Sequence, residues 1–272
     1  MQAFSPSRWL PALAALSLAL PLRADTQLQP LPPGRGMIDQ PCPRQIAGLW
    51  SASPYVRKYD WAWLCRYRAA NAALDPRVRP QAVFIGDSIT EGWIDADPGF
   101  FASGNLDRGI SGQTSPQMLL RFMQDVVALR PRVVHIIAGT NDVAGNTGPT
   151  DIAAYQDNVR AMVALARANG IAVVLGSIPP ADRFNSATDI VPAPRIAALN
   201  AWLRQYAREQ GLIYADYFAA LTGPNGELPA RYSADGLHPN AAGYAVMRPI
   251  AERAITQALA QAAPLPAPSP TD

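Results

Sequence analysis

The chain contains a carboxylate and an imidazole at a spacing that suits general base catalysis. Only two histidines occur, His135 and His238, and histidine is the most frequent general base because its ordinary pKa lies near neutral pH. Asp235 precedes His238 by three residues in a polar segment. At that spacing a carboxylate can fold back to Nδ1 and leave Nε2 facing outward, which is the base-and-orienter half of a serine triad. A chance Asp-x-x-His in a turn is the alternative, and the pair alone fits both.

The other histidine has a different setting. His135 stands inside the apolar run of residues 133–137, where a side chain is expected to be buried. We therefore expect His135 to be a hydrogen-bonded structural residue of the core and not a base.

Ser88 is the nucleophile that would match this base. A hydroxyl is a weak nucleophile until a base takes its proton. Ser88 follows the apolar run of residues 81–86, where a side chain can point into a cleft. An ordinary helix-capping serine is the alternative, and the chain lacks the Gly-x-Ser-x-Gly elbow of the α/β-hydrolases.

Acyl transfer also needs hydrogen-bond donors for the oxyanion that develops on the reacting carbonyl. Gly109 can bring a backbone N–H close because it has no side chain, Asn141 carries an amide donor, and the Ser88 N–H is a third candidate. Glycine and asparagine are also common in plain turns. The whole set indicates acyl transfer more strongly than any member, since every candidate falls at a strand end or just before a helix.

The elements that must position these residues alternate between strands and helices. Apolar runs of strand length are separated by segments whose apolar residues recur at helical spacing. The expected strands span 81–86, 132–138, 171–176 and 212–215, with a weaker one at 105–109. The expected helices span 115–129, 151–169, 195–210 and a last one from near Asn240. Ser115 suits the N-cap of the first helix and Pro116 its first position. This alternation favours a parallel sheet covered on both faces, with functional residues after the carboxyl ends of its strands.

The four segments that carry the candidates resemble, in the same order, the sequence blocks of the SGNH (GDSL) hydrolase superfamily. They read Gly-Asp-Ser-Ile at 86–89, Arg-Gly-Ile-Ser-Gly-Gln-Thr at 108–114, Gly-Thr-Asn-Asp at 139–142 and Asp-Gly-Leu-His-Pro at 235–239. The resemblance covers about residues 80–255. In the second block the family usually has an acidic residue where Gln113 stands, at a position that is not catalytic.

This resemblance implies a three-layer α/β/α, flavodoxin-like fold around a parallel five-stranded sheet. It implies hydrolysis of esters through an acyl-enzyme, without a metal or organic cofactor. Its triad would be Ser88, Asp235 and His238, and its oxyanion hole would consist of Ser88, Gly109 and Asn141.

The charge balance argues against several classes of partner. Residues 1–24 contribute two of the 23 basic residues and no acid, so the remainder has 23 − 2 = 21 basic and 21 acidic residues. This balance gives no reason to expect nucleic acid or an anionic membrane as a partner. Two distant histidines and two upstream cysteines do not form an obvious metal site.

Residues 1–24 have the pattern of a signal peptide. Arg8 provides a positive start, the apolar stretch of residues 9–22 is short for a bilayer span, and Ala24 offers a cleavage position. We therefore expect a periplasmic or secreted protein without stable membrane insertion after cleavage. An uncleaved anchor or a buried helix is the alternative.

The remaining segments flank the expected hydrolase domain at 76–260. An N-terminal extension at 25–75 is Pro-rich and then helical over 55–74, and the Pro-rich tail at 261–272 is expected to be disordered. Cys42 and Cys65 are the only cysteines. In an exported protein an isolated pair is often a disulfide, which would tie the extension together, whereas two buried free thiols are the alternative.

We expect short acyl esters, acetyl groups on carbohydrates above all, as the substrates. A lysophospholipase or thioesterase activity is the enzymatic alternative. A glycan- or protein-binding module that uses Trp61 and Trp63 is the non-enzymatic one, although a pure binder needs no complete catalytic set. Trp93 follows the nucleophile closely and could line the substrate pocket, but we expect it to pack in the core.

Overall fold

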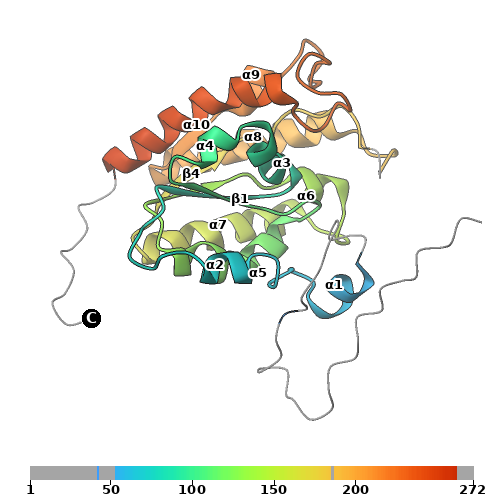
Figure 1. Ribbon diagram of the computed structural model, residues 1–272. Coiled ribbons are helices and arrows are strands. Elements are labelled where there is room, and N and C mark those ends of the chain that lie inside the picture. Colours follow the sequence, from blue (N-terminus) through green and yellow to red (C-terminus); the bar gives the residue numbers. More distant parts are fainter. Residues whose placement is uncertain (1–41, 43–52, 185–186, 262–272) are drawn as a thin grey trace, which may run out of the picture. The chain divides into compact units, whose positions relative to one another are not determined.

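The computed structural model describes residue 42, residues 53–184 and residues 187–261. Its centre is a sheet of five parallel strands in the order β2-β1-β3-β4-β5 (Figure 1). The strands are β1 (Ala82–Gly86), β2 (Asn105–Gly109), β3 (Val133–Ile136), β4 (Ala172–Gly176) and β5 (Ile213–Ala215). All five expected strands are confirmed to within two residues at each end. The order 2-1-3-4-5 is that of the flavodoxin-like folds, in which ligands bind outside the carboxyl ends of the strands.

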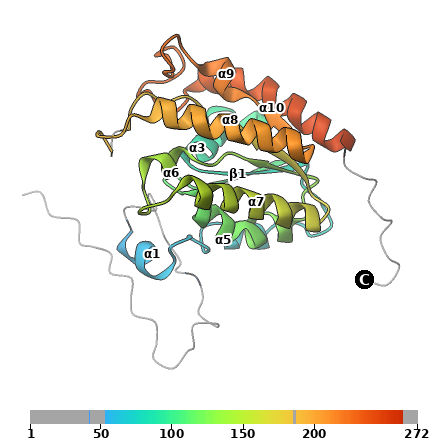
Figure 2. The same ribbon diagram turned by 180° about the vertical axis from the view of Figure 1, so that it is seen from behind.

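Helices cover both faces of this sheet. Figures 1 and 2 show α5 and α7 on one side and α3 and α10 on the other. The helices and helical turns are α1 (Pro54–Tyr59), α2 (Arg68–Ala72), α3 (Ser88–Ala96), α4 (Pro98–Phe101), α5 (Ser115–Asp125), η3 (Val127–Leu129), α6 (Thr140–Ala144), α7 (Ile152–Ala168), α8 (Pro192–Gln210), α9 (Tyr217–Leu221) and α10 (Ala241–Gln261).

Two apolar layers hold the helices to the sheet. Val83 and Ile85 of β1 belong to the layer that also contains buried residues of α5, α7 and α8. Ala82 and Phe84 belong to the opposite layer, with buried residues of α3, α4, α9 and α10. Because successive side chains of a strand point to opposite faces, a strand covered on both faces must be apolar throughout. This explains the unbroken apolar runs in the sequence.

The helix predicted at 115–129 is shorter than expected and begins differently. Thr114, and not Ser115, is its N-cap, since the Gln117 side chain accepts from the Thr114 N–H at 3.0 Å in a capping box. The α-helix ends at Asp125, and a 3₁₀ turn follows it.

The extension is not one helix over 55–74. Helix α1 stops at Tyr59 because the Asp60 side chain accepts from the N–H groups of Leu64 and Cys65, at 2.7 and 3.0 Å, and closes a turn there. Helix α2 starts only at Arg68. A disulfide joins Cys65 to Cys42. The predicted signal peptide and residues 262–272 of the predicted tail lie outside the described residues.

Candidate active site

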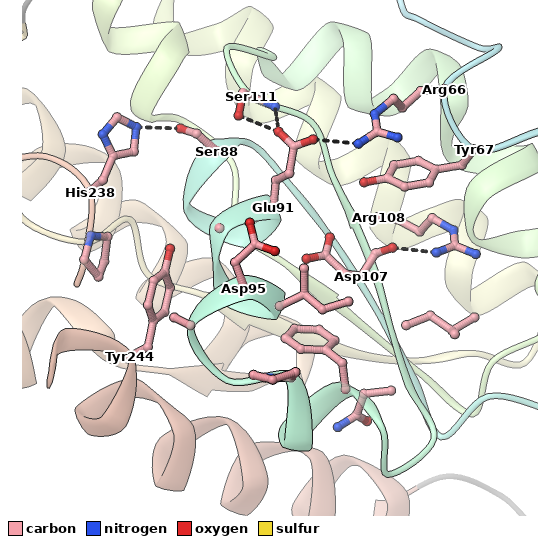
Figure 3. A pocket seen from close by; sticks show the side chains of 18 of the residues that line it. Arg66, Tyr67, Ser88, Glu91, Asp95, Asp107, Arg108, Ser111, His238 and Tyr244 are labelled. Carbon is pink, nitrogen blue, oxygen red and sulfur yellow. Dashed lines mark hydrogen bonds and ion pairs between the residues drawn. The ribbon is translucent and has the colours of Figure 1, made fainter. Parts of the chain in front are cut away.

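The structure brings Ser88, His238 and Asp235 into one hydrogen-bonded chain. Ser88 Oγ lies 2.9 Å from His238 Nε2, although 150 residues separate them in the sequence (Figure 3). His238 Nδ1 lies 2.7 Å from Asp235 Oδ2. This is the geometry in which a histidine can take the proton of a serine while a carboxylate holds the ring.

The loop before α10 fixes the Asp–His pair. Asp235 Oδ1 accepts from the N–H groups of Leu237 and His238, at 3.0 and 2.8 Å, and from the Ser233 hydroxyl at 3.0 Å. Although partial burial pushes the pKa of Asp235 upward, the hydrogen bonds from His238 and Leu237 hold it well below its usual range. Asp235 is therefore ionised at neutral pH and able to stabilise an imidazolium.

Ser88 is not in a long loop, because it is the first residue of α3. Asp87 alone links it to β1 and caps the helix, with Oδ1 accepting from the Ile89 N–H at 2.9 Å. Asp87 is fully buried, and this burial raises its pKa to about 6. The first N–H groups of a helix have no acceptor within the helix. The Ser88 N–H is therefore available beside its own hydroxyl.

Asn141 also lies in the first turn of a short helix, α6, just after β3. Its Nδ2 atom lies 3.0 Å from the carbonyl oxygen of Gln113 and 3.3 Å from Asp87 Oδ2. Asn146 donates to Asn141 Oδ1 at 2.7 Å. These contacts fix the orientation of the amide, and Asn141 lines the same groove as Ser88. Asn146 carries no motif of its own in the sequence, so its contact with Asn141 is visible only in the structure.

Gly109 does not join the other oxyanion candidates. Its N–H donates to Asp107 Oδ1 at 2.6 Å, and Gly109 is absent from the lining of the groove beside Ser88. A Cβ at Gly109 would lie 2.2 Å from the backbone nitrogen of Glu91. The residue is glycine because β2 and α3 approach closely there, and with its N–H engaged by Asp107 this geometry lends no support to the oxyanion role expected for Gly109.

Gly112, three residues further along the same block, lines the groove together with Ser88 and Asn141. Its φ of +84° falls in the region that favours glycine. Sequence reasoning passed over this residue because the block contains two glycines. Nothing in the local pattern shows which of them lines the groove beside the serine.

The groove that opens at Ser88 has a volume of about 1470 Å³. It runs from the Ser88–His238 pair along the exposed side of α3 to a charged region, as Figure 3 shows. The charged residues that line it are Arg66, Glu91, Asp95, Asp107 and Arg108. Apolar parts of the lining include Ile94, Phe101 and Leu237. Such a groove can hold a ligand much larger than a single acyl group.

His135 and Trp93 both lie in the core and away from the groove. His135 is fully buried, stacks on Phe84 and has Nε2 2.7 Å from the Tyr217 hydroxyl. Burial lowers its pKa to about 3, so it is a neutral core residue, as expected. Trp93 is also fully buried, between Phe100 and Tyr244. It packs in the core and does not line the groove.

Among the described residues, no three His, Cys, Asp or Glu side chains lie together in a way that could hold a metal ion. No helix in this part of the chain is long and apolar enough to cross a membrane.

Comparisons with known proteins show the family of this chain. Residues 84–246 match the GDSL-like lipase/acylhydrolase family. A candidate acylhydrolase from Bacteroides fragilis is 43% identical, with a TM-score of 0.70 over 74% of this chain and 99% of that one. A GDSL-like lipase from Bacteroides thetaiotaomicron is 42% identical, with a TM-score of 0.70 over 73% and 99%.

An acetylxylan esterase from Geobacillus stearothermophilus, solved as a catalytic mutant, shares the fold at 21% identity. Its TM-score is 0.54 over 66% of this chain and 96% of that one. None of the curated proteins matches the chain. With the family match extending over more than half of its length, the chain belongs to the GDSL-like lipase/acylhydrolase family and is an ester hydrolase.

Proposed function

We propose that this enzyme hydrolyses short-chain acyl esters through an acyl-enzyme on Ser88. The observation that carries the proposal is the hydrogen-bonded chain Ser88–His238–Asp235, which opens on the groove. Ser88 Oγ attacks the ester carbonyl carbon while His238 Nε2 takes its proton. The tetrahedral intermediate expels the alcohol, which receives that proton from His238. Water then attacks the acyl-enzyme with His238 again as base, and the carboxylic acid leaves.

Three donors support the oxyanion of each tetrahedral intermediate in this proposal. They are the Ser88 N–H, the Asn141 amide and the Gly112 N–H, which takes the place that the sequence analysis gave to Gly109. Gly112 is chosen because it lines the groove with the other two, whereas the Gly109 N–H is engaged by Asp107.

We further propose acetyl esters of carbohydrates as the substrate class. The support is the polar part of the groove, since charged side chains such as Glu91, Asp95 and Arg108 line it beyond the serine. Hydroxyl groups of a sugar can exchange hydrogen bonds with such residues, whereas a long acyl chain would desolvate them at a cost. A protein of the same fold is an acetylxylan esterase. Hydrolysis of lipid acyl esters or thioesters is the competing activity.

A fluorophosphonate probe tests Ser88 as the nucleophile, and a series of p-nitrophenyl esters tests the substrate class. We expect the probe to label the wild type and to lose its target in Ser88→Ala. Among the p-nitrophenyl esters, we expect kcat/KM to be highest for the acetate and to fall as the acyl chain lengthens. An acetylated oligosaccharide, which leaves as the free sugar hydroxyl, should have a higher kcat/KM than p-nitrophenyl acetate. A well-folded wild type that neither labels nor turns over any ester would refute the catalytic proposal. A maximum at long acyl chains would replace the carbohydrate proposal by the lipid one.

We also propose that the protein is exported. Its support is the disulfide between Cys42 and Cys65, because disulfides persist mainly in oxidising compartments. The expected result is a mature protein in the periplasm or medium that begins at Asp25, as read by intact mass. A full-length protein in the cytoplasm with two free thiols would refute export.

A further inference from the structure

The loop of residues 109–113, which carries Gly112, is held from outside the hydrolase domain. We call it the oxyanion loop. Its Ile110 is fully buried, and the cluster that buries it consists of Val56, Trp63 and Tyr67 from the extension. No other buried residue of the described chain belongs to this cluster. The apolar side chains that pack around Ile110 therefore come from the extension.

Polar contacts from the same segment fix both ends of the oxyanion loop. The Tyr67 hydroxyl donates to the carbonyl oxygen of Gly109, at the start of the loop. At its end, Gln113 Nε2 donates to the carbonyl oxygen of Ala62 at 2.8 Å. Both contacts are buried, where a hydrogen bond cannot be exchanged for one to water without cost.

Glu91 holds the middle of the loop from α3, one helical turn after Ser88. Its Oε2 accepts from the Ser111 N–H at 2.8 Å and from the Ser111 hydroxyl. Its Oε1 accepts from Arg66 at 3.0 Å, and Figure 3 shows this Arg66–Glu91–Ser111 chain beside Ser88. The residue immediately before Gly112 is thus tied to the helix that carries the nucleophile.

The segment that makes these contacts is itself fixed. Asp60 closes its turn, and Gln124 of α5 donates to the carbonyl oxygen of Leu64 at 2.6 Å. The disulfide of Cys65 directly precedes Arg66. Arg66 also stacks on Tyr67 at 4.8 Å, so the two side chains that reach the site support each other.

We propose that Arg66, Tyr67 and Glu91 are positioning residues that set the Gly112 N–H in the oxyanion hole. The proposal rests on the catalytic role given above to Ser88 and Gly112. Gly112 has no side chain to anchor it, so its neighbours Ser111 and Gln113 must fix its N–H. A donor displaced by about 1 Å loses much of its effect on a transition state, by as much as ~10²-fold in rate.

This role differs from a general contribution to stability. The Arg66 and Glu91 side chains are 36% and 27% exposed, and ion pairs that water reaches contribute little to folding. Changes at either residue are therefore expected to lower kcat and to leave the melting temperature near its wild-type value. The KM for p-nitrophenyl acetate should also change little, because this substrate has no sugar to contact Glu91.

The test compares kcat and KM for p-nitrophenyl acetate in Glu91→Ala, Glu91→Gln, Arg66→Gln and Tyr67→Phe. Arg160→Gln is the matched control, because Arg160 forms an exposed ion pair with Asp157 on α7. We expect kcat to fall about 10- to 100-fold in Glu91→Ala, less in Glu91→Gln, and about 3- to 10-fold in Arg66→Gln and Tyr67→Phe. KM should stay within about twofold, and the control should match the wild type.

The double variant Arg66→Gln/Glu91→Ala gives a second readout. Because the hydrogen-bonded path from Arg66 to the loop runs through Glu91, and only its stacking on Tyr67 remains without it, substitution of Arg66 should have much less effect on kcat once Glu91 is alanine. A kcat equal to that of the control, a change confined to KM, or additive losses in the double variant would each overturn the inference. If Glu91→Ala does not fold, kcat in Arg66→Gln and Tyr67→Phe decides the question in the same way.

Failure of this inference is separable from failure of the proposed function. Wild-type turnover that is lost in Ser88→Ala establishes the catalytic role independently. Unchanged kcat in the Glu91 and Arg66 variants of that active enzyme overturns only the positioning role.

Discussion

His238 and Asp235 contact each other twice. Asp235 Oδ2 lies 2.7 Å from His238 Nδ1, while Asp235 Oδ1 accepts from the His238 backbone N–H at 2.8 Å. One carboxylate thus fixes both the ring and the backbone of the same histidine. The ring orientation toward Ser88 is therefore set within a single turn of four residues.

Asp235→Asn should separate these two contacts. An asparagine Oδ1 can still accept the backbone N–H, so the loop is expected to keep its form. The neutral amide nitrogen that replaces Asp235 Oδ2 can no longer stabilise a His238 imidazolium. We therefore expect kcat to fall about 10³- to 10⁴-fold, as in related triads. Ester turnover and circular dichroism measure the two effects. A loss of less than tenfold in a folded variant would remove Asp235 from the mechanism.

Asn141→Ala should leave the fold intact and slow turnover at least tenfold, because one oxyanion donor is removed. Such losses are typically ~10²–10³ in kcat. The measurement is kcat for p-nitrophenyl acetate, with Asn158→Ala as a control for removing an amide that contacts the Ser115 hydroxyl elsewhere. Unchanged turnover in Asn141→Ala would show that the oxyanion is stabilised without it.

Gly109→Ala is expected to act through stability. Its new Cβ would lie 2.2 Å from the Glu91 nitrogen and 2.8 Å from the Asp87 carbonyl oxygen. Overpacking against backbone costs about 1–3 kcal/mol or more. The midpoint of chemical unfolding should fall accordingly. An alanine variant of wild-type stability with greatly reduced kcat would instead restore the oxyanion role to Gly109.

Asp107 should make the protein less stable as the pH rises from about 4 to 7. Burial, only partly offset by the Gly109 N–H, raises the pKa of Asp107 to about 7 from an ordinary value near 3.8. In that window the folded protein keeps a proton that the unfolded chain has released, so stability is lost with rising pH. Asp87 acts in the same direction up to about pH 6.

Asp107→Asn removes this titration and keeps an Oδ1 that can accept from Gly109. We therefore expect a shallower decline of the melting temperature between pH 4 and pH 7 than in the wild type. If the melting temperatures of the wild type and of Asp107→Asn change with pH in the same way, Asp107 has an ordinary pKa in the folded state.

Replacing both Cys42 and Cys65 by serine tests the link between the disulfide and the site. The bond closes a sequence separation of 23 residues, and removing such a crosslink costs about 3 kcal/mol. Because Cys65 adjoins Arg66, kcat should fall as well, by a few fold at a temperature where the variant is fully folded. A variant with reduced stability and unchanged kcat would limit the disulfide to a structural role.

The sequence by itself determined the fold class and the identity of the catalytic triad candidates. Strands buried on both faces must be apolar throughout, so β1, β3 and β4 can be read directly from their composition, whereas the edge strand β2 (Asn105–Gly109) contains Asp107 and Arg108 and has a weaker signal. Ser88, Asn141 and His238 could be found because each stands next to such a strand or before the last helix. Chain order and residue type are sufficient there, since parallel strands bring their carboxyl ends to one edge.

Only the tertiary structure decided which glycine lines the groove beside Ser88 and what the extension contacts. Gly109 and Gly112 have the same local signature, but α3 packs closely against Gly109, whereas Gly112 lines the groove. The contacts of Arg66 and Tyr67 span about 25 and 42 residues of sequence. No periodicity encodes such contacts, because they depend on how the extension packs against the oxyanion loop once the sheet has formed.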